Sequence, residues 1–244
     1  MPNCVRTQYA AVDRKRSRGY TSIVLTLIAV LLSSPLFADV SATDCRPAPA
    51  NVGCYYVPAD APDDAPLLIY HRGHHPKLKS KVSDSECLAS SRQAFTAYAL
   101  GKLADEKKTA VLVTCRSGQA VTEPLIAALA TTAGKPFKKR ILAAHSGGYV
   151  GLGGTLDAGV AASRILMLDN FYDASEGGLA KKVQKAVSGG ATCAGYFTPH
   201  NKKRYEAAYK PNVTCAVDEL DDNALHDPTV KRCLGAYVSG TACL

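Results

Sequence analysis

The sequence lacks internal repeats, low-complexity segments and any linker-like stretch that would divide residues 39–244 into two domains. It also lacks a G-x-x-x-x-G-K loop for phosphates, and the glycines of residues 151–154 follow a serine instead of opening a nucleotide site. We therefore expect one domain and no cofactor. With 47% hydrophobic residues among 244, the chain is long enough to bury a sizeable core.

No apolar run reaches the roughly 20 residues that a membrane-spanning helix needs. The most apolar stretch, residues 22–37, follows a basic segment and precedes Ala38 and Ala42, an order typical of a secretory signal peptide. The basic residues are Arg14, Lys15, Arg16 and Arg18. We expect residues 1–38 to be removed, with cleavage as late as residue 42. Residues 39–244 would then be secreted or periplasmic without stable membrane insertion; the alternative is a membrane anchor that is retained.

The cysteines include no C-x-x-C pair, which argues against a zinc site or a redox motif. Of the nine cysteines, Cys4 lies in the expected signal, and the remaining eight are an even number, as a disulfide framework in an oxidising compartment requires. Their order suggests four local bridges among the many pairings that eight cysteines allow. These are Cys45 with Cys54, Cys87 with Cys115, Cys193 with Cys215, and Cys233 with Cys243.

Little net charge remains once residues 1–38 are set aside. Residues 39–244 carry 24 basic and 20 acidic residues, a net charge of +4 against +8 for the whole chain. The lysines are scattered and have few aromatic neighbours, which is typical of solvated faces. We expect no nucleic-acid partner, although a weak preference for anionic surfaces stays open. No feature of the sequence indicates the oligomeric state.

Short apolar runs alternate with helix-like segments along the chain. The runs are continuous in Val, Ile and Leu, which indicates strands covered on both faces. Strands are expected at 54–58, 67–73, 109–115, 140–146, 163–169, 191–198 and 212–217. Helices are expected at 91–108, 121–134, 176–190, 201–210 and 227–238. This alternation predicts an α/β fold, a three-layer sandwich around a mostly parallel sheet.

The stretch RILAAHSGGYVGLGG, residues 140–154, runs an expected strand into Ser146 and then into glycines. Ligands bind at the carboxyl ends of the strands in an open parallel sheet. A serine on a sharp strand-to-helix turn needs small residues two positions before and after it, and Ala144 and Gly148 meet this need. The pattern predicts that Ser146 is a nucleophile.

With these residues the sequence resembles the α/β-hydrolase family. The likeness extends over residues 39–244 in element order and is sharpest at AHSGG, residues 144–148, and HRGHH, residues 71–75. The family's usual elbow is G-x-S-x-G, and here Ala144 replaces the first glycine. The resemblance implies an α/β-hydrolase fold and acyl transfer through a serine, an acid and a histidine in that chain order.

The resemblance places the catalytic histidine beyond the last strand, where His226 lies. Neutral imidazole has the pKa to take the proton of the serine hydroxyl near neutrality. His200 is the other histidine after Ser146. The alternative role for His226 is to cap the final helix.

The acid is expected one strand before the family's commonest position. Residues 191–201 carry no carboxylate, whereas Asp169 ends the preceding strand. Asp169 would fix the tautomer of His226 and stabilise its imidazolium. Asp173 is the alternative acid, and the alternative role for Asp169 is a helix N-cap.

An acyl-transfer site also needs N–H donors for the oxyanion. The resemblance implies the backbone amide of Gly147 as one donor. The other comes from the loop after the early strand, with Arg72 or His74 as the candidate. Arg72 separates His71 from Gly73, where relatives carry His-Gly.

Three further side chains beside these loops, His71, Tyr149 and Tyr172, are pocket candidates, although aromatic residues at strand ends also serve as packing. A metal site of His71, His74 and His75 is the competing interpretation. Adjacent His74 and His75 would point apart on an extended segment, and no nearby cysteine or carboxylate completes a site. We therefore expect no metal.

The segment between Asp169 and the strand that begins near Ala191 holds about twenty residues, mostly one helix. It leaves no room for a large inserted cap, so we expect an open site. Such a site suits a polymeric or bulky ester, with a small-molecule ester as a surrogate. The alternatives are a peptidase or amidase that uses the same residues, and a non-catalytic binding protein on a hydrolase fold, which the departures at Ala144 and Arg72 keep open.

Overall fold

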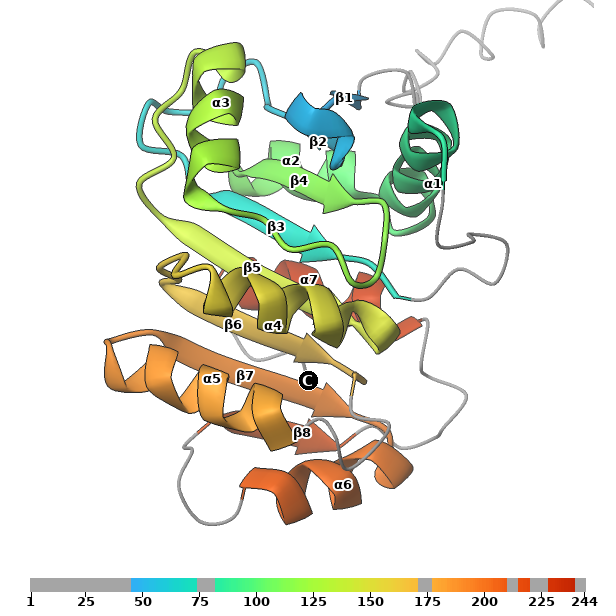
Figure 1. Ribbon diagram of the computed structural model, residues 1–244, viewed down its shortest axis with the longest axis vertical. Helices are drawn as coiled ribbons and strands as arrows, with labels where there is room; N and C mark the ends of the chain where they lie inside the picture. Colours follow the sequence, from blue (N-terminus) through green and yellow to red (C-terminus); the bar gives the residue numbers. More distant parts are fainter. Residues whose placement is uncertain (1–44, 74–81, 171–176, 210–214, 220–227, 240–244) are drawn as a thin grey trace, which may run out of the picture. The chain divides into compact units, whose positions relative to one another are not determined.

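The computed structural model of the protein (Figure 1) describes residues 45–73, 82–170, 177–209, 215–219 and 228–239. Within these ranges, eight strands form one sheet in the order β1-β2-β4-β3-β5-β6-β7-β8. The strands are β1 Arg46–Pro47, β2 Gly53–Tyr56, β3 Leu67–His71, β4 Ala110–Thr114, β5 Arg140–His145, β6 Arg164–Leu168, β7 Thr192–Phe197 and β8 Ala216–Glu219. β2 pairs antiparallel with both β1 and β4, and every other pair is parallel.

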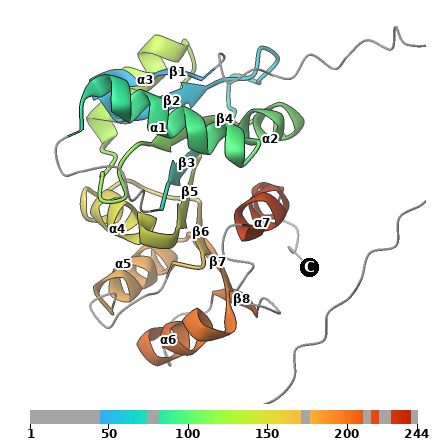
Figure 2. The ribbon, with the colours of Figure 1, turned by 90° about the vertical axis from the view of Figure 1, so that its right-hand side faces the viewer.

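Helices cover both faces of the sheet. They are α1 Asp84–Ala97, α2 Leu100–Lys107, α3 Glu123–Ala133, α4 Tyr149–Asp157, α5 Gly177–Ser188, α6 Pro199–Tyr209 and α7 Pro228–Val238. One core cluster joins the sheet to α3, α4 and α5, and the other joins it to α1, α2 and α7. Figure 2 shows α4 and α5 on one side of the sheet and α7 on the other. The α/β three-layer sandwich is therefore confirmed.

The central strands are buried on both faces. In β3, Leu67 and Ile69 belong to the cluster under α3, α4 and α5, whereas Leu68 and Tyr70 belong to the cluster under α1, α2 and α7. Successive side chains of a strand point to opposite faces. A continuous apolar run is thus what this sheet requires.

The expected helix at 91–108 is two helices in the structure. α1 begins earlier, at Asp84, because Ser83 and Glu86 form a capping box in which the Ser83 N–H donates to Glu86 Oε2 at 2.8 Å. It ends at Ala97, and Ala99 then adopts φ +52° before α2 begins. The last strand, β8, runs from Ala216 to Glu219, whereas residues 212–214 of the expected strand lie outside the described residues.

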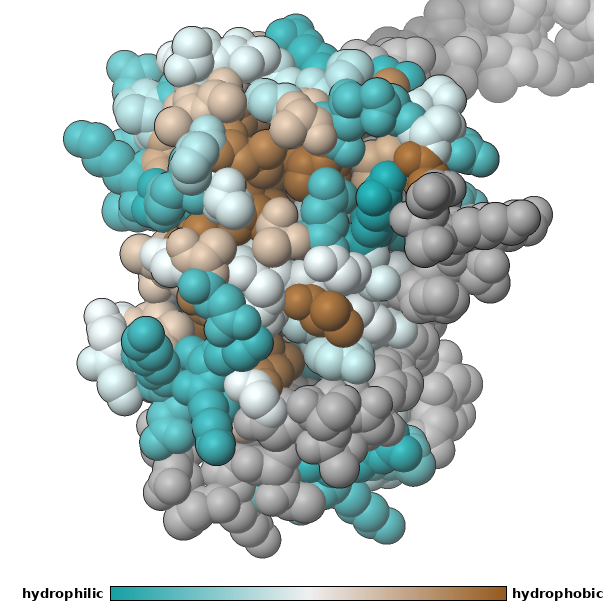
Figure 3. Space-filling model, in the orientation of Figure 1, coloured by the Kyte–Doolittle hydropathy of each residue, from teal (hydrophilic) through white to brown (hydrophobic). Residues whose placement is uncertain are grey.

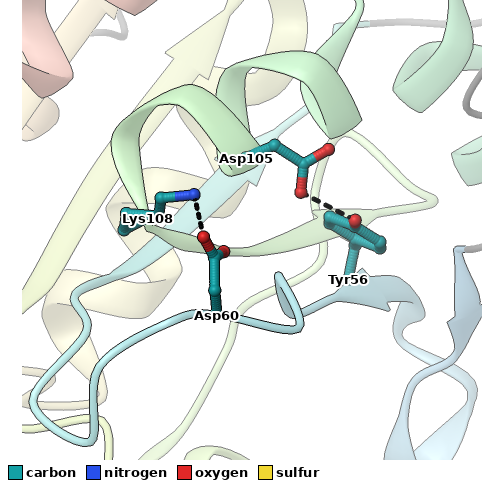
Figure 4. Close-up of polar contacts among 4 residues, drawn as sticks. All are labelled: Tyr56, Asp60, Asp105 and Lys108. Carbon is teal, nitrogen blue, oxygen red and sulfur yellow. Dashed lines mark hydrogen bonds and ion pairs between the residues drawn. The ribbon is translucent and has the colours of Figure 1, made fainter. Parts of the chain in front are cut away.

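Polar contacts attach α2 to the early part of the chain (Figure 4). The Tyr56 hydroxyl donates to Asp105 Oδ1 at 2.8 Å, and Lys108 forms an ion pair with Asp60. These contacts link α2 to β2 and to the loop that follows it. On the opposite face of the sheet, hydrophilic side chains gather over α5, where Lys181 is exposed (Figure 3).

Three of the four expected disulfides are present, with Cα–Cα distances of 5.6 Å, 5.0 Å and 4.7 Å. They join Cys45 to Cys54, Cys87 to Cys115, and Cys193 to Cys215. The fourth expected pair includes Cys243, which lies outside the described residues. The signal peptide predicted at residues 1–38 also lies outside them. None of the described helices is long and apolar enough to span a membrane.

Candidate active site

Ser146 stands on a sharp turn between β5 and α4. β5 ends at His145, residues 146–148 form a 3₁₀ turn, and α4 follows at once. Ser146 has φ +53°, a left-handed conformation that costs energy for a residue with a Cβ and that recurs at functional turns. The Ser146 side chain is half-buried and lies at the carboxyl edge of the sheet.

The loop after β3 packs directly against this serine. A Cβ on Gly73 would lie 2.7 Å from Ser146 Cβ and 3.2 Å from Ser146 Oγ, so only glycine permits the approach. The two expected backbone donors, Arg72 and His74, flank Gly73 in sequence. His74 lies outside the described residues, and Gly147 follows Ser146 within the turn.

The Arg72 side chain leaves this loop toward α1. Arg72 as a whole is 8% exposed. Its Nη1 donates to the Ser90 carbonyl oxygen at 2.8 Å and also contacts Ser90 Oγ. Burial lowers the pKa of the guanidinium, and Tyr70 and Tyr98 lie near enough to oppose this shift. Among the described residues, no carboxylate forms an ion pair with Arg72. The side chain ties the loop to α1, and the backbone N–H groups of Arg72 and His74 both stay candidate oxyanion donors.

His71 is fully buried beneath α4. Its Nε2 lies 3.1 Å from Thr155 Oγ1, and that hydroxyl accepts the N–H of Val121 at 2.9 Å. Burial lowers the pKa of His71 to about 3, so the imidazole is neutral at ordinary pH. We expected a pocket residue here, and the structure gives His71 a place in the packed interior.

The other pocket and metal candidates are less fully described. Tyr149 is partly buried against the core cluster under α3, α4 and α5. Tyr172 and His75 lie outside the described residues. In the part of the chain that is described, no group of three or more His, Cys, Asp or Glu residues is placed to hold a metal ion.

Asp169 follows β6, the strand next to β5. His145 and Leu168 are register partners, so Ser146 and Asp169 leave neighbouring strands at the same level. Asp169 is buried, and its Oδ1 accepts three hydrogen bonds at 2.9 Å, from Thr198 N, Thr198 Oγ1 and Asn201 Nδ2. The structure therefore holds a carboxylate inside the carboxyl edge of the sheet, beside the strand that carries Ser146.

Of the two histidine candidates, the structure describes His200 but not His226. His226 lies outside the described residues, between β8 and α7 in sequence. His200 is exposed on the first turn of α6. Asp173, the alternative acid, also lies outside the described residues.

Sequence reasoning missed Thr198 and Asn201. They lie in YFTPHN, the segment after β7 that carries no carboxylate. A strand followed by Thr-Pro signals a helix start, with the threonine at the N-cap. The contact with Asp169 has no local signal, because it joins residues 29 and 32 positions apart.

Comparison with known proteins gives a likeness among solved structures. No family model matches the sequence, and no curated protein matches it. Among solved structures, the chain is similar to LpqC, a poly(3-hydroxybutyrate) depolymerase from Bordetella parapertussis, with a TM-score of 0.49 and 11% sequence identity. The similarity covers 78% of this chain and 85% of that one. The fold is therefore defined by the sheet order and layers of this chain, and its chemistry by its own residues.

Proposed function

We propose that the protein is a serine hydrolase that cleaves an ester, with Ser146 as nucleophile, His226 as general base and Asp169 as the acid that orients it. One relationship carries the proposal: Ser146 is held at φ +53° at the end of β5, and a buried carboxylate, Asp169, follows the neighbouring strand at the same level. Left-handed backbone at a residue with a Cβ is uncommon and recurs at functional turns, and here both proposed catalytic residues that the structure describes adopt it.

The proposed reaction proceeds through an acyl-enzyme. His226 takes the proton of Ser146 Oγ as that oxygen attacks the ester carbonyl, and the oxyanion accepts N–H bonds from Gly147 and from Arg72 or His74. His226 then protonates the departing alcohol. Water enters, gives a proton to His226 and attacks the acyl carbonyl, and the released carboxylic acid leaves Ser146 with its proton restored.

The chain length between β6 and α5 supports an open site. β6 ends at Leu168 and α5 begins at Gly177, so the connection is too short to hold a cap domain. An open site admits a polymeric or bulky ester, and a small nitrophenyl ester would serve as its surrogate. The disulfides of the structure suit a secreted or periplasmic setting.

Labelling with a fluorophosphonate, which reacts with activated serines, tests the proposal. We expect the purified, oxidised protein to label and Ser146→Ala not to label. Asp169→Asn and His226→Ala should label at least a hundredfold more slowly, because the serine proton then has no competent base. The matched control is Asp157→Asn, which removes a surface ion pair with Lys182 at the far end of α4. His200→Ala tests the other histidine that follows Ser146, and we expect it to label at the wild-type rate.

Two results would contradict the proposal. If folded wild-type protein does not label, the non-catalytic binding protein becomes the better interpretation. If Ser146→Ala labels as fast as wild type, the nucleophile is another residue. Turnover of nitrophenyl esters beside the matching anilides then separates an esterase from an amidase, since the amide demands that His226 protonate an amine.

A further inference from the structure

The end of β7 and the start of α6 form a set of three donors around one oxygen of Asp169. Thr198 N, Thr198 Oγ1 and Asn201 Nδ2 each lie 2.9 Å from Asp169 Oδ1. Asp169, Thr198 and Asn201 are 1%, 3% and 2% exposed, so these bonds are shielded from water. Hydrogen bonds to a charged oxygen in such surroundings are stronger than neutral ones.

The placement of these donors follows from the sheet. β6 and β7 are parallel neighbours, and the N–H of Asp169 donates to the Tyr196 carbonyl at 2.8 Å, which continues the pairing beyond β6. Thr198 then precedes α6, an eleven-residue helix whose amino end favours negative charge. The end of β7 carries no acid. It provides the donors that stabilise Asp169, the acid at the end of the neighbouring strand β6.

Asp169 also has an unusual backbone. Its φ of +43° is left-handed and costs energy, so the surrounding contacts must hold it. Three donors on one carboxylate oxygen fix the rotation of the carboxylate as well as its charge.

We infer that Thr198 and Asn201 are positioning residues that hold the Asp169 carboxylate charged and in one orientation. The inference rests on the proposed function, because it takes Asp169 and His226 as partners. Neither Thr198 nor Asn201 touches the reacting atoms in this scheme. They act through Asp169.

A pH profile separates this role from a merely structural one. Asp169 and His226 would take up a proton as a coupled pair, and the active state is the one with the pair negatively charged. The donors stabilise that charged state. Their removal therefore raises the pH at which the pair becomes protonated, and the acid limb of the kcat profile moves to higher pH.

The experiment uses the full oxidised protein and hydrolysis of a nitrophenyl ester between pH 4.5 and 9. Thr198→Val removes the hydroxyl donor at nearly constant volume and should move the acid limb upward by about one pH unit. It should also lower kcat roughly tenfold while KM stays within about twofold. Asn201→Asp replaces a donor by a second carboxylate and should move the limb further. Thr198→Ser keeps the hydroxyl and should restore the wild-type profile.

The matched control is Thr109→Val. Thr109 is also a buried threonine, and its hydroxyl donates to the Lys107 carbonyl. It precedes β4, at the amino end of that strand, whereas the candidate site lies at the carboxyl ends. Its substitution should leave the acid limb in place. Circular dichroism and the midpoint of urea unfolding identify folded variants. If Thr198→Val does not fold, the acid limb of Asn201→Asp tests the inference.

The results distinguish the inference from the function on which it rests. If Ser146→Ala and Asp169→Asn are inactive but folded Thr198→Val and Asn201→Asp keep the wild-type acid limb, the inference is wrong and the proposed function stands. If Asp169→Asn reacts like wild type, Asp169 is not the acid and the inference fails with that assignment. A shift in both variants, reversed in Thr198→Ser and absent in Thr109→Val, supports it.

Discussion

Gly148 lies directly against the carbonyl of His71. A Cβ on Gly148 would stand 2.2 Å from the His71 oxygen and 2.8 Å from its carbonyl carbon, distances that real Cβ atoms do not show. The end of β3 and the turn that carries Ser146 are therefore in contact through main-chain atoms. No side chain fits between them.

We expect Gly148→Ala to separate these two segments. The backbone must shift to admit the methyl group, which should lower the free energy of unfolding by about 1–3 kcal/mol, as overpacking does. The shift should also slow fluorophosphonate labelling at least tenfold, because Ser146 and the loop at Gly73 move apart. Gly118→Ala is the control, since its Cβ would meet only Val150 Cγ1, at 3.5 Å. Labelling of Gly148→Ala at the wild-type rate would show that the turn tolerates the shift.

Acid should destabilise the protein through His71. Burial holds the pKa of His71 at about 3 in the folded chain, against about 6.5 in the unfolded chain. Between these values the unfolded state binds a proton that the folded state does not. The free energy of unfolding therefore falls as the pH drops from 6.5 toward 3, by about 1.4 kcal/mol per pH unit from this group.

Urea unfolding at pH 7.0, 5.5 and 4.5 checks this contribution of His71. Other groups also titrate in the range, so the informative quantity is the difference between wild type and His71→Asn, which retains an amide near Thr155. Wild type should lose stability more steeply than the variant as the pH falls. Parallel curves would mean that His71 becomes protonated in the folded protein without cost.

Much of the sheet follows from the sequence because its strands are buried on both faces and read as continuous apolar runs. The start of α1 has a local signal in the sequence, the Ser83-x-x-Glu86 capping box. The break between α1 and α2 has no such signal, because Ala99 adopts a left-handed conformation without being glycine or asparagine. Propensity favours a continuous helix through an alanine, and tertiary packing overrides that preference here.

The candidate site divides in the same way. Ser146 and Asp169 follow strands, so their positions at the carboxyl edge were predictable from the alternation of elements. The roles of Thr198, Asn201 and the Arg72 side chain were not. They depend on which strand lies beside which and on the path of a side chain through the interior, and neither leaves a periodic pattern in the sequence.

The disulfide between Cys193 and Cys215 should matter for the site as well as for stability. It closes a segment with a sequence separation of 22 and holds β7 to the residue before β8. Replacement of both cysteines by serine should lower the free energy of unfolding by about 3 kcal/mol. It should also slow labelling, because β8 precedes His226. Replacement of Cys45 and Cys54, at the other edge of the sheet, should lower stability but leave labelling unchanged; equal slowing in both pairs would indicate a general loss of packing.

Arg72→Met should separate activity from stability. The substitution removes a buried guanidinium that has no carboxylate partner among the described residues, together with its hydrogen bonds to Ser90. Loss of the hydrogen bonds destabilises the fold, whereas loss of a desolvated charge stabilises it, so the free energy of unfolding should change by no more than about 1 kcal/mol. The loop that carries the candidate backbone donor is then no longer tied to α1. Fluorophosphonate labelling should slow roughly tenfold, less than the roughly hundredfold or more that complete loss of an oxyanion donor costs.

Arg92→Met is the matched control for Arg72→Met. Arg92 lies on α1, the helix that carries Ser90, and its Nε donates to the Cys45 carbonyl at 3.0 Å. This variant should label at the wild-type rate. If Arg72→Met also labels at that rate, the contact of Gly73 with Ser146 holds the loop by itself. If Arg72→Met instead unfolds at much lower urea concentration, the hydrogen bonds to Ser90 outweigh the cost of burying the charge, and the guanidinium is a stabilising element of α1 as well as an anchor for the loop.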